Sequence, residues 1–372
     1  MSAILAWANA HGVAVTAWGL GSSVVGQPLA TRGGISLDLS RMDRIIAVDE
    51  RDLVVRVEAG VVGGKLEQHL NGLGYTLHHS PQSLHRSTVA IGVATRGTGQ
   101  FSTRYVGIEE LYYALTAVLA DGSIVTTAAQ PRMSVVPDLR HLFIGSEGCF
   151  GVITEVALRI FPVAEARSYE VVDLPSVDRG IEAMRDIMAA GLKPFLLRFY
   201  DRAEARHATQ DPDYASSVMF LGCEGSVTMA QAELEACRSI CARHGGECRG
   251  PEAATAWMSR RYDFSTIESY VGRPEGVAET IEVAGSWSTI GATYRALTER
   301  LKPLATEVLG HFSHTYTTGT SLYVILLGNA ESALAAEATL REIWKVSMET
   351  ALETGAAISH HHGVGLARVA YL

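Results

Sequence analysis

The residues most suited to chemistry are three adjacent histidines near the C-terminus, His360, His361 and His362, which stand between Ser359 and the segment Gly363-Val364-Gly365. Imidazoles take up and release protons near neutral pH, so this run could serve proton transfer. A solvated loop and a metal-binding histidine tract are the two plainer interpretations. Consecutive side chains point in different directions and do not readily converge on one ion, so we predict no metal here. The flanking glycines favour a tight, buried turn.

Three further segments combine glycine with small hydroxyl side chains, at 18–26, 81–99 and 145–155. The first follows a strand-like stretch at 13–16, and its glycines and serines could bring several backbone N–H groups into one concavity that binds phosphate oxygens. An ordinary tight turn is the alternative for this stretch. Its spacing matches neither the Rossmann fingerprint nor the P-loop, which disfavours a nicotinamide cofactor and an ATPase. Three glycine clusters separated in the sequence predict that one long ligand contacts all of them.

Length and composition exclude several classes of protein. The chain has 372 residues, enough for two domains or for one with a large insertion. A formal net charge of -9 argues against nucleic-acid binding, which needs a basic face. The five cysteines are expected to be reduced thiols, and the spacing of Cys237, Cys241 and Cys248 does not match zinc or iron–sulfur ligand patterns. No apolar run reaches the roughly 18 residues of a membrane-spanning helix.

The elements that must position these residues change in character along the chain. The N-terminal part predicts antiparallel hairpins at 45–57 and 115–126, a helix near 64–73 and a strand at 151–160 that Pro162 ends. Beyond Pro162, helices and strands alternate. We predict helices at 177–190 and 229–244 and strands at 195–200, 217–221 and 322–327, whereas 251–288 has no clear period. The pattern predicts an α+β protein with domains at 1–162 and 163–372.

These motifs together resemble flavoproteins of the vanillyl-alcohol oxidase / p-cresol methylhydroxylase (PCMH-type) superfamily, and within it the alkyldihydroxyacetonephosphate synthase family. The first and third clusters are shared across the superfamily. The synthase branch is matched by the triple histidine and by the segments 131–134, 137–141 and 81–88, whereas the D-lactate and glycolate dehydrogenase branch has Glu-His-Gly at the histidine run. The resemblance is weakest over 205–300. It implies a two-part PCMH-type FAD-binding domain followed by an α+β substrate (cap) domain with an antiparallel sheet.

The resemblance implies FAD as the cofactor, bound noncovalently because no histidine is clearly placed for covalent attachment. The first cluster would hold the pyrophosphate, the second would line the flavin, and the third would hold the rest of the dinucleotide. The cofactor-binding residues implied in this way are Gly19, Leu20, Gly21, Ser22, Ser23, Val24, Gln82, Ser83, Ser87, Thr88, Thr95, Arg96, Gly97, Thr98, Gly145, Ser146, Glu147, Gly148, Gly151 and Ile153.

The resemblance also implies a substrate side. Tyr323 matches the family's catalytic tyrosine, which transfers a proton at the substrate carbon facing the flavin, and the three histidines would lie beside it as proton-transfer and charge-stabilising groups. Arg198 matches an arginine that binds the substrate phosphate. A charge among apolar neighbours rarely stands without a partner, so an ion pair of Arg198 with Asp201 or another carboxylate is the alternative.

The implied reaction exchanges the acyl group of acyl-dihydroxyacetone phosphate for a fatty alcohol, a step of ether-lipid biosynthesis, through a covalent adduct at the flavin N5 atom. An FAD-dependent D-2-hydroxyacid dehydrogenase or oxidase of the D-lactate/glycolate type is an open alternative, because a guanidinium suits carboxylates as well as phosphates. An inactive flavin-binding fragment is another, since we expect both termini to be truncated relative to that family. We expect a cytoplasmic protein with a small-molecule or lipid-phosphate substrate and no nucleic-acid partner, and we leave open whether it forms a homodimer.

Overall fold

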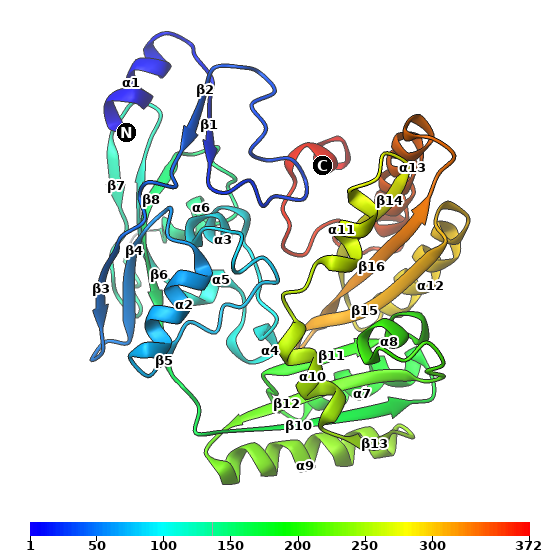
Figure 1. Ribbon diagram of the computed structural model, residues 1–372. Helices are drawn as coiled ribbons and strands as arrows, with labels where there is room; N and C mark the ends of the chain where they lie inside the picture. The colour runs from blue at the N-terminus through cyan, green and yellow to red at the C-terminus, as the bar shows by residue number, and fades with distance from the viewer. Residues whose placement is uncertain (136) are drawn as a thin grey trace.

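Two large β-sheets are built from separate parts of the chain in the computed structural model, which describes residues 1–135 and 137–372 (Figure 1). The N-terminal part forms a five-stranded sheet in the order β3-β4-β8-β6-β7, and the rest forms a seven-stranded antiparallel sheet in the order β13-β10-β12-β11-β15-β16-β14. The C-terminal segment returns to lie between the two parts (Figure 1). The C-terminal segment therefore contacts both the first part and the large sheet.

The first part surrounds its sheet with short helices and two small strand pairs. Its strands are β1 (Val15–Trp18), β2 (Ile35–Asp38), β3 (Ile45–Asp49), β4 (Val54–Glu58), β5 (Tyr75–Thr76), β6 (Tyr112–Val118), β7 (Ile124–Thr126), β8 (Val152–Arg159) and β9 (Phe161–Pro162). Its helices are α1 (Ser2–Ala10), α2 (Gly63–Gly72), α3 (Val89–Thr95), α4 (Ser102–Tyr105), α5 (Ile108–Leu111) and α6 (Arg140–Phe143). The pair β1-β2 is parallel, and β5 pairs antiparallel with β9.

The second part alternates long strands with amphipathic helices. Its strands are β10 (Ala166–Leu174), β11 (Leu196–Tyr200), β12 (Ser217–Gly225), β13 (Glu247–Gly250), β14 (Gly276–Ser286), β15 (Glu307–Tyr316) and β16 (Gly319–Asn329). Its helices are α7 (Val177–Ala189), α8 (Arg202–Thr209), α9 (Val227–Arg243), α10 (Glu252–Arg260), α11 (Ser265–Val271), α12 (Ile290–Leu301), α13 (Ala333–Glu353) and α14 (Gly365–Arg368), with 3-10 turns at Lys302–Leu304 and Val369–Tyr371.

The two faces of the large sheet bury different sets of side chains. Helices α7, α9, α12 and α13 pack against one face and enclose the largest hydrophobic cluster, to which β11 contributes Leu197 and Phe199. Because side chains alternate along a strand, Arg198 and Tyr200 point to the opposite face. That face carries α8 and α10 together with Phe101 from the first part. The second face thus looks toward the N-terminal part of the chain.

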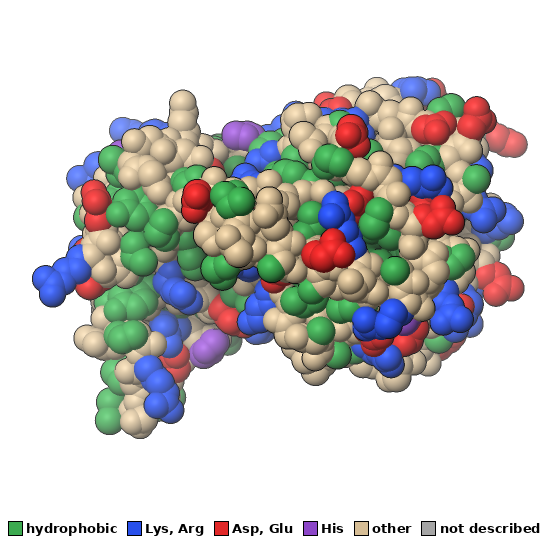
Figure 2. Space-filling view, turned by 90° about the horizontal axis from the view of Figure 1, so that it is seen from below, with side chains coloured by type: hydrophobic (Ala, Val, Ile, Leu, Met, Phe, Trp, Pro, Cys, Tyr) green, Lys and Arg blue, Asp and Glu red, His purple; other side chains and the backbone are tan. Residues whose placement is uncertain are grey.

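The structure confirms most of the elements expected from the sequence. Both hairpins form, as β3-β4 and β6-β7, and the helix near 64–73 is α2. The prediction for Pro162 was wrong in detail: β8 ends at Arg159, and Pro162 itself pairs with Tyr75 in the small β5-β9 sheet. We propose a domain division near residue 162, because the large antiparallel sheet begins at Ala166. Figure 2 shows basic and acidic side chains interspersed on one face of the molecule, without a basic patch over this view.

Close packing between α7 and β11 gives a stability prediction. A Cβ added at Gly180 would overlap the ring of Phe199, which is completely buried. Gly180→Ala should therefore lower the free energy of unfolding by about 1–3 kcal/mol through overpacking. Gly72→Ala is the matched helix control, because a Cβ there meets no atom within 4 Å, and it should be neutral or stabilising by up to about 1 kcal/mol. Equal effects in denaturant titrations would refute this account of the packing.

Candidate active site

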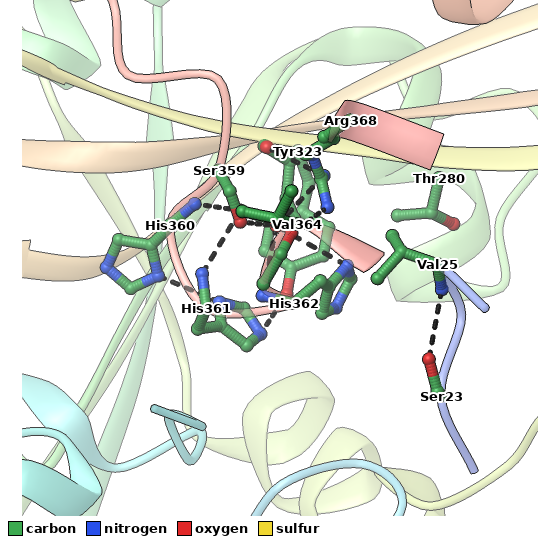
Figure 3. Close-up of polar contacts among 12 residues, drawn as sticks. Ser23, Val25, Thr280, Tyr323, Ser359, His360, His361, His362, Val364 and Arg368 are labelled. Atoms are coloured by element: carbon green, nitrogen blue, oxygen red, sulfur yellow. Dashed lines mark hydrogen bonds and ion pairs between the residues drawn. The ribbon is translucent and has the colours of Figure 1, made fainter. Parts of the chain in front are cut away.

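The histidine run is held by one buried carboxylate, that of Glu282 on β14. It accepts hydrogen bonds from the backbone N–H groups of His360, His361 (3.3 Å) and His362 (3.1 Å) and from the Ser359 hydroxyl (2.9 Å). Arg368 donates to the same carboxylate at 3.0 Å, and both side chains of this ion pair are completely buried. Figure 3 shows Arg368 beside the histidine run. The run is therefore an ordered turn, as the flanking glycines predict, and the interpretation as a solvated loop is wrong.

A second set of contacts ties the same turn to the first part of the chain. The Glu147 carboxylate accepts from the backbone N–H groups of Val364 (2.6 Å) and Gly365 (3.0 Å). The Gln27 amide donates to the carbonyl of His362 at 2.8 Å, and Leu366 N–H donates to the carbonyl of Val25 at 2.8 Å. Gly365 has a φ of +50°, and a Cβ there would overlap the backbone of Val25. The histidine turn thus joins the first and third glycine clusters to the large sheet.

The functional side chains stand in a row across four neighbouring strands. Glu282 on β14 is paired in register with Tyr323 on β16, Tyr323 with His311 on β15, and His311 with Tyr200 on β11. The rings of His311 and Tyr323 are stacked, with centroids 4.7 Å apart. Strand pairing, rather than proximity in sequence, brings these residues together. Glu282 and His311 were missed from the sequence, because neither lies in a recognisable motif.

Tyr323 is bonded to the histidine run. Its hydroxyl lies 2.6 Å from Nε2 of His361, and Nδ1 of His361 lies 2.8 Å from Nδ1 of His360. Nε2 of His360 lies 2.8 Å from the hydroxyl of Tyr316. His314, at a β-bulge with a φ of +50°, stacks on His360 and hydrogen-bonds the Ser102 hydroxyl at 2.7 Å. Tyr316 and His314 are also additions to the site that the sequence did not single out.

Burial sets the protonation of this cluster. Desolvation lowers the pKa of His360 to about 4 and that of His361 well below its ordinary value, and it lowers the pKa of His362 as well. Desolvation, together with the nearby Glu282 charge, raises the pKa of Tyr323 well above its ordinary value. Burial also opposes the charge on Glu282, but His362, Arg368 and His360 hold its pKa below the usual range. Near pH 7 the imidazoles are neutral, Tyr323 keeps its proton, and Glu282 is ionised.

Arg198 lies on β11, two residues before Tyr200, and the side chains that it hydrogen-bonds are neutral. It donates from Nε to the Tyr200 hydroxyl at 2.8 Å and from a terminal nitrogen to Nε2 of His311 at 2.9 Å, and its guanidinium lies 5.0 Å from the centre of the Trp257 ring. His311 in turn donates from Nδ1 to Glu204 at 2.7 Å. The ion pair with Asp201 that the sequence left open does not form: among the described residues no carboxylate lies within ion-pair distance of Arg198. Asp201 instead caps α8 and accepts from Tyr294.

The first glycine cluster offers free donors of the kind that a pyrophosphate needs. In the described part of the chain, none of the backbone N–H groups of residues 19–24 donates to a protein acceptor. Gly21 has a φ of +68°, and a Cβ there would meet Trp18 at 2.6 Å. A Cβ on Gly19 would lie 2.8 Å from the Thr88 hydroxyl, so the first cluster touches the second. Unpaired amides suit a dianionic diphosphate, and its binding by Gly19, Leu20, Gly21, Ser22, Ser23 and Val24 stays a prediction.

The second and third clusters meet around helix α3. Gly145 N–H donates to the carbonyl of Val93 and Glu147 N–H to that of Ala94, while Gly97 N–H donates to the carbonyl of Gly92. Some predicted residues have structural partners: Ser83 bonds Ser87 at 3.0 Å, and the Gln82 amide donates to the carbonyl of Asp263 at 2.9 Å. Ile153 lies in the core of the first part. The structure also places Thr88, Thr95, Arg96, Thr98, Ser146, Gly148 and Gly151 in these two segments, and their contacts with a cofactor stay predictions.

Comparison with known proteins defines the class. Residues 1–128 match the family described as "FAD binding domain", and residues 163–372 match "FAD linked oxidases, C-terminal domain". The chain belongs to this family of FAD-linked oxidases, so FAD is its cofactor and the protein is an FAD-linked enzyme. No helix in residues 1–135 and 137–372 has the length and apolar character needed to cross a membrane.

The relatives that this chain resembles catalyse different reactions or have no assigned reaction. An uncharacterized FAD-linked oxidoreductase, YgcU, of Escherichia coli is 31% identical over 99% of this chain and 80% of its own length. An alkyldihydroxyacetonephosphate synthase of Trypanosoma brucei brucei is 25% identical over 99% of this chain and 66% of its own length. A D-lactate dehydrogenase [cytochrome] of Arabidopsis thaliana is 31% identical over 55% of this chain and 36% of its own length. A solved alkyldihydroxyacetonephosphate synthase shares the fold, with a TM-score of 0.81, 21% identity, and coverage of 96% of this chain and 70% of that one.

The Glu282–Arg368 pair yields a prediction. Glu282→Gln should lower the free energy of unfolding by about 3–5 kcal/mol, because it leaves the buried Arg368 cation without its anion. Glu279→Gln, on the same strand, is the control: its carboxylate accepts from Trp344 at 2.7 Å, and burial raises its pKa, so removal of its charge should cost no more than about 1 kcal/mol. Urea unfolding of the FAD-bound proteins measures both. Similar losses in the two variants would show that the ion pair does not anchor the turn.

Proposed function

We propose that this protein is an FAD-dependent enzyme of the alkyldihydroxyacetonephosphate synthase type, which exchanges the acyl group of acyl-dihydroxyacetone phosphate for a fatty alcohol. The observation that carries the proposal is the Arg198 guanidinium, 9% exposed, without a carboxylate partner and one imidazole away from Tyr323. A buried cation is costly unless it is paired. Its partners, a phenol and an imidazole, satisfy hydrogen bonds, but the Glu204 carboxylate reaches it only through His311, so no anion contacts the guanidinium directly. A substrate phosphate would supply the missing charge with a geometry that suits the guanidinium fork.

The histidine run supports the same choice. In a hydroxyacid dehydrogenase of the D-lactate branch, the resemblance implies a carboxylate within the run. Here all three positions are imidazoles that burial keeps neutral, and the nearest carboxylate, Glu282, is occupied by Arg368 and backbone amides. The synthase of Trypanosoma brucei brucei also aligns with almost the whole chain, whereas the D-lactate dehydrogenase of Arabidopsis thaliana aligns with about half.

In this proposal each side chain has one task. The flavin, when bound, would supply an electrophilic ring system. Arg198 binds the phosphate and fixes the substrate relative to Tyr323. Tyr323, whose hydroxyl is 2.6 Å from Nε2 of His361, accepts the substrate proton at Oη as it passes its own proton to that nitrogen. Glu282 holds the histidine turn in place through the backbone.

A direct exchange assay tests the reaction. FAD-loaded protein incubated with acyl-dihydroxyacetone phosphate and labelled hexadecanol should form the alkyl ether and release the fatty acid without an electron acceptor. The flavin absorbance should persist when D-lactate or glycolate is added anaerobically, because no net hydride transfer is expected. Bleaching by these acids, without exchange, would overturn the proposal in favour of a D-2-hydroxyacid dehydrogenase. Neither exchange nor bleaching would refute both reactions and support a flavin-binding protein without catalysis.

The role of Arg198 can be separated from folding. Arg198→Lys should raise the KM for the acyl substrate by roughly 10-fold or more and lower kcat less, because an ammonium cannot reproduce the planar, bidentate contact. Arg238→Lys is the control, since Arg238 is already paired with Glu170 on the same sheet. Steady-state kinetics at constant FAD occupancy measure both variants. If Arg198→Lys leaves KM unchanged, or loses FAD and unfolds, the anion-binding role is wrong.

A further inference from the structure

A continuous hydrogen-bonded chain leads away from the proposed reacting centre. It runs from the Tyr323 hydroxyl to Nε2 of His361 (2.6 Å), from Nδ1 of His361 to Nδ1 of His360 (2.8 Å), and from Nε2 of His360 to the Tyr316 hydroxyl (2.8 Å). Every nitrogen of both rings is used. Two strands, β15 and β16, supply the terminal tyrosines, and the Glu282 carboxylate fixes the histidine backbone between them.

The Nδ1–Nδ1 contact restricts the protonation of the two rings. A neutral imidazole carries a proton on only one of its nitrogens. Two facing Nδ1 atoms form a hydrogen bond only if one carries a proton and the other does not, so His360 and His361 must be opposite tautomers. The resting state that can pass a proton away from Tyr323 has the Tyr323 hydroxyl donating to Nε2 of His361, so that the proton of His361 lies on Nδ1. The proton of His360 then lies on Nε2 and points to the Tyr316 oxygen.

We propose that Tyr323, His361, His360 and Tyr316 form a proton relay that carries the substrate proton from the reacting carbon to the flavin-domain side of the site. The relay rests on the proposed function in one respect, namely that Tyr323 receives that proton. As Tyr323 gains it, the Tyr323 hydroxyl proton passes to Nε2 of His361, the Nδ1 proton of His361 to Nδ1 of His360, and the Nε2 proton of His360 to the oxygen of Tyr316. Each ring ends as the other neutral tautomer, and one proton leaves Tyr316.

The first part of the chain offers an acceptor for that last proton. Burial and the charges of Glu109 and Glu110 all raise the pKa of Tyr316. Oε2 of Glu109 is buried and has no hydrogen-bond partner among the described residues. Burial raises the pKa of Glu109, which favours its protonated form. The proposal assigns the Glu109 carboxylate as the acceptor of the proton that leaves Tyr316; charge is conserved in that transfer, and return of the proton in the reverse order resets the relay.

Metal binding is an alternative role for the same imidazoles. Ring nitrogens of His314, His360 and His361 lie within 4.8 Å of one another, close enough to hold a metal ion. Both nitrogens of His360 and of His361 are hydrogen-bonded, and Nδ1 of His314 is bonded to Ser102. A metal ion held by the two Nδ1 atoms would have to break the central link between His360 and His361. The observed bonds therefore favour the relay.

Nitrogen NMR tests the relay without depending on turnover. In FAD-loaded protein labelled with ¹⁵N-histidine, and assigned with His360→Gln and His361→Gln, both rings should be neutral between pH 6 and 8. They should be opposite tautomers, and Tyr316→Phe should shift Nε2 of His360. The same tautomer on both rings, a charged ring, or a stoichiometric divalent metal found by elemental analysis would each overturn the proposal.

Kinetics test whether the relay carries the transferred proton. Tyr316→Phe should lower kcat by about 10-fold or more, leave KM for the acyl substrate nearly unchanged, and change the solvent deuterium isotope effect, because the last link is removed. Tyr112→Phe is the matched control: it removes a buried hydroxyl with a single contact, to Thr127 at 3.5 Å in the first part. Equal kinetics in the two variants would overturn the relay. If the wild-type protein lacks exchange activity, the proposed function fails, while the tautomer measurement still decides the relay.

Discussion

The structure of the site depends on the buried ion pair between Glu282 and Arg368. Neither side chain is exposed, and the Glu282 carboxylate also accepts from Ser359 and from three consecutive backbone amides. A carboxylate in such a place is stable only if every lone pair has a donor, and the histidine turn supplies most of them. The histidine turn has one conformation because those amides all bond to Glu282. The charge and the turn therefore stabilise each other, and neither would persist alone.

This arrangement explains why three consecutive histidines can have distinct positions. Their backbone amides bind Glu282, so their rings are free to diverge: His360 and His361 bond each other, while His362 lies edge-on to Tyr323. Burial keeps the rings neutral, and neutral rings can donate from one nitrogen and accept at the other. A charged imidazole could only donate. The backbone anchor thus creates the condition for proton transfer between side chains.

Sequence alone predicted the local parts of this design well. The hairpins, the helices α2, α7 and α9 and the glycine turns follow from short-range patterns, and the histidine run was visible directly, whereas α12 and α13 were not predicted. Glu282, His311, His314 and Tyr316 were missed because their roles arise from strand register. Glu282 stands opposite Tyr323 only because β14 pairs with β16, and His314 turns toward His360 because of a β-bulge. Arg198 was found, but its neutral partners could not be foreseen, since an ion pair with Asp201 fitted the sequence equally well.

The charged side chains of Glu282 and Arg198 have opposite effects on the pKa of Tyr323. Glu282 raises the pKa of Tyr323, and Arg198 lowers it. The charge of Glu282 is balanced by direct contact with Arg368, whereas Arg198 contacts no carboxylate directly and is linked to Glu204 only through His311. A phosphate on Arg198 would weaken its influence, and the pKa of Tyr323 would rise further. Substrate binding would thus disfavour a resting phenolate, so that a proton reaching Tyr323 is passed on to His361 in the same step rather than held as separated charge.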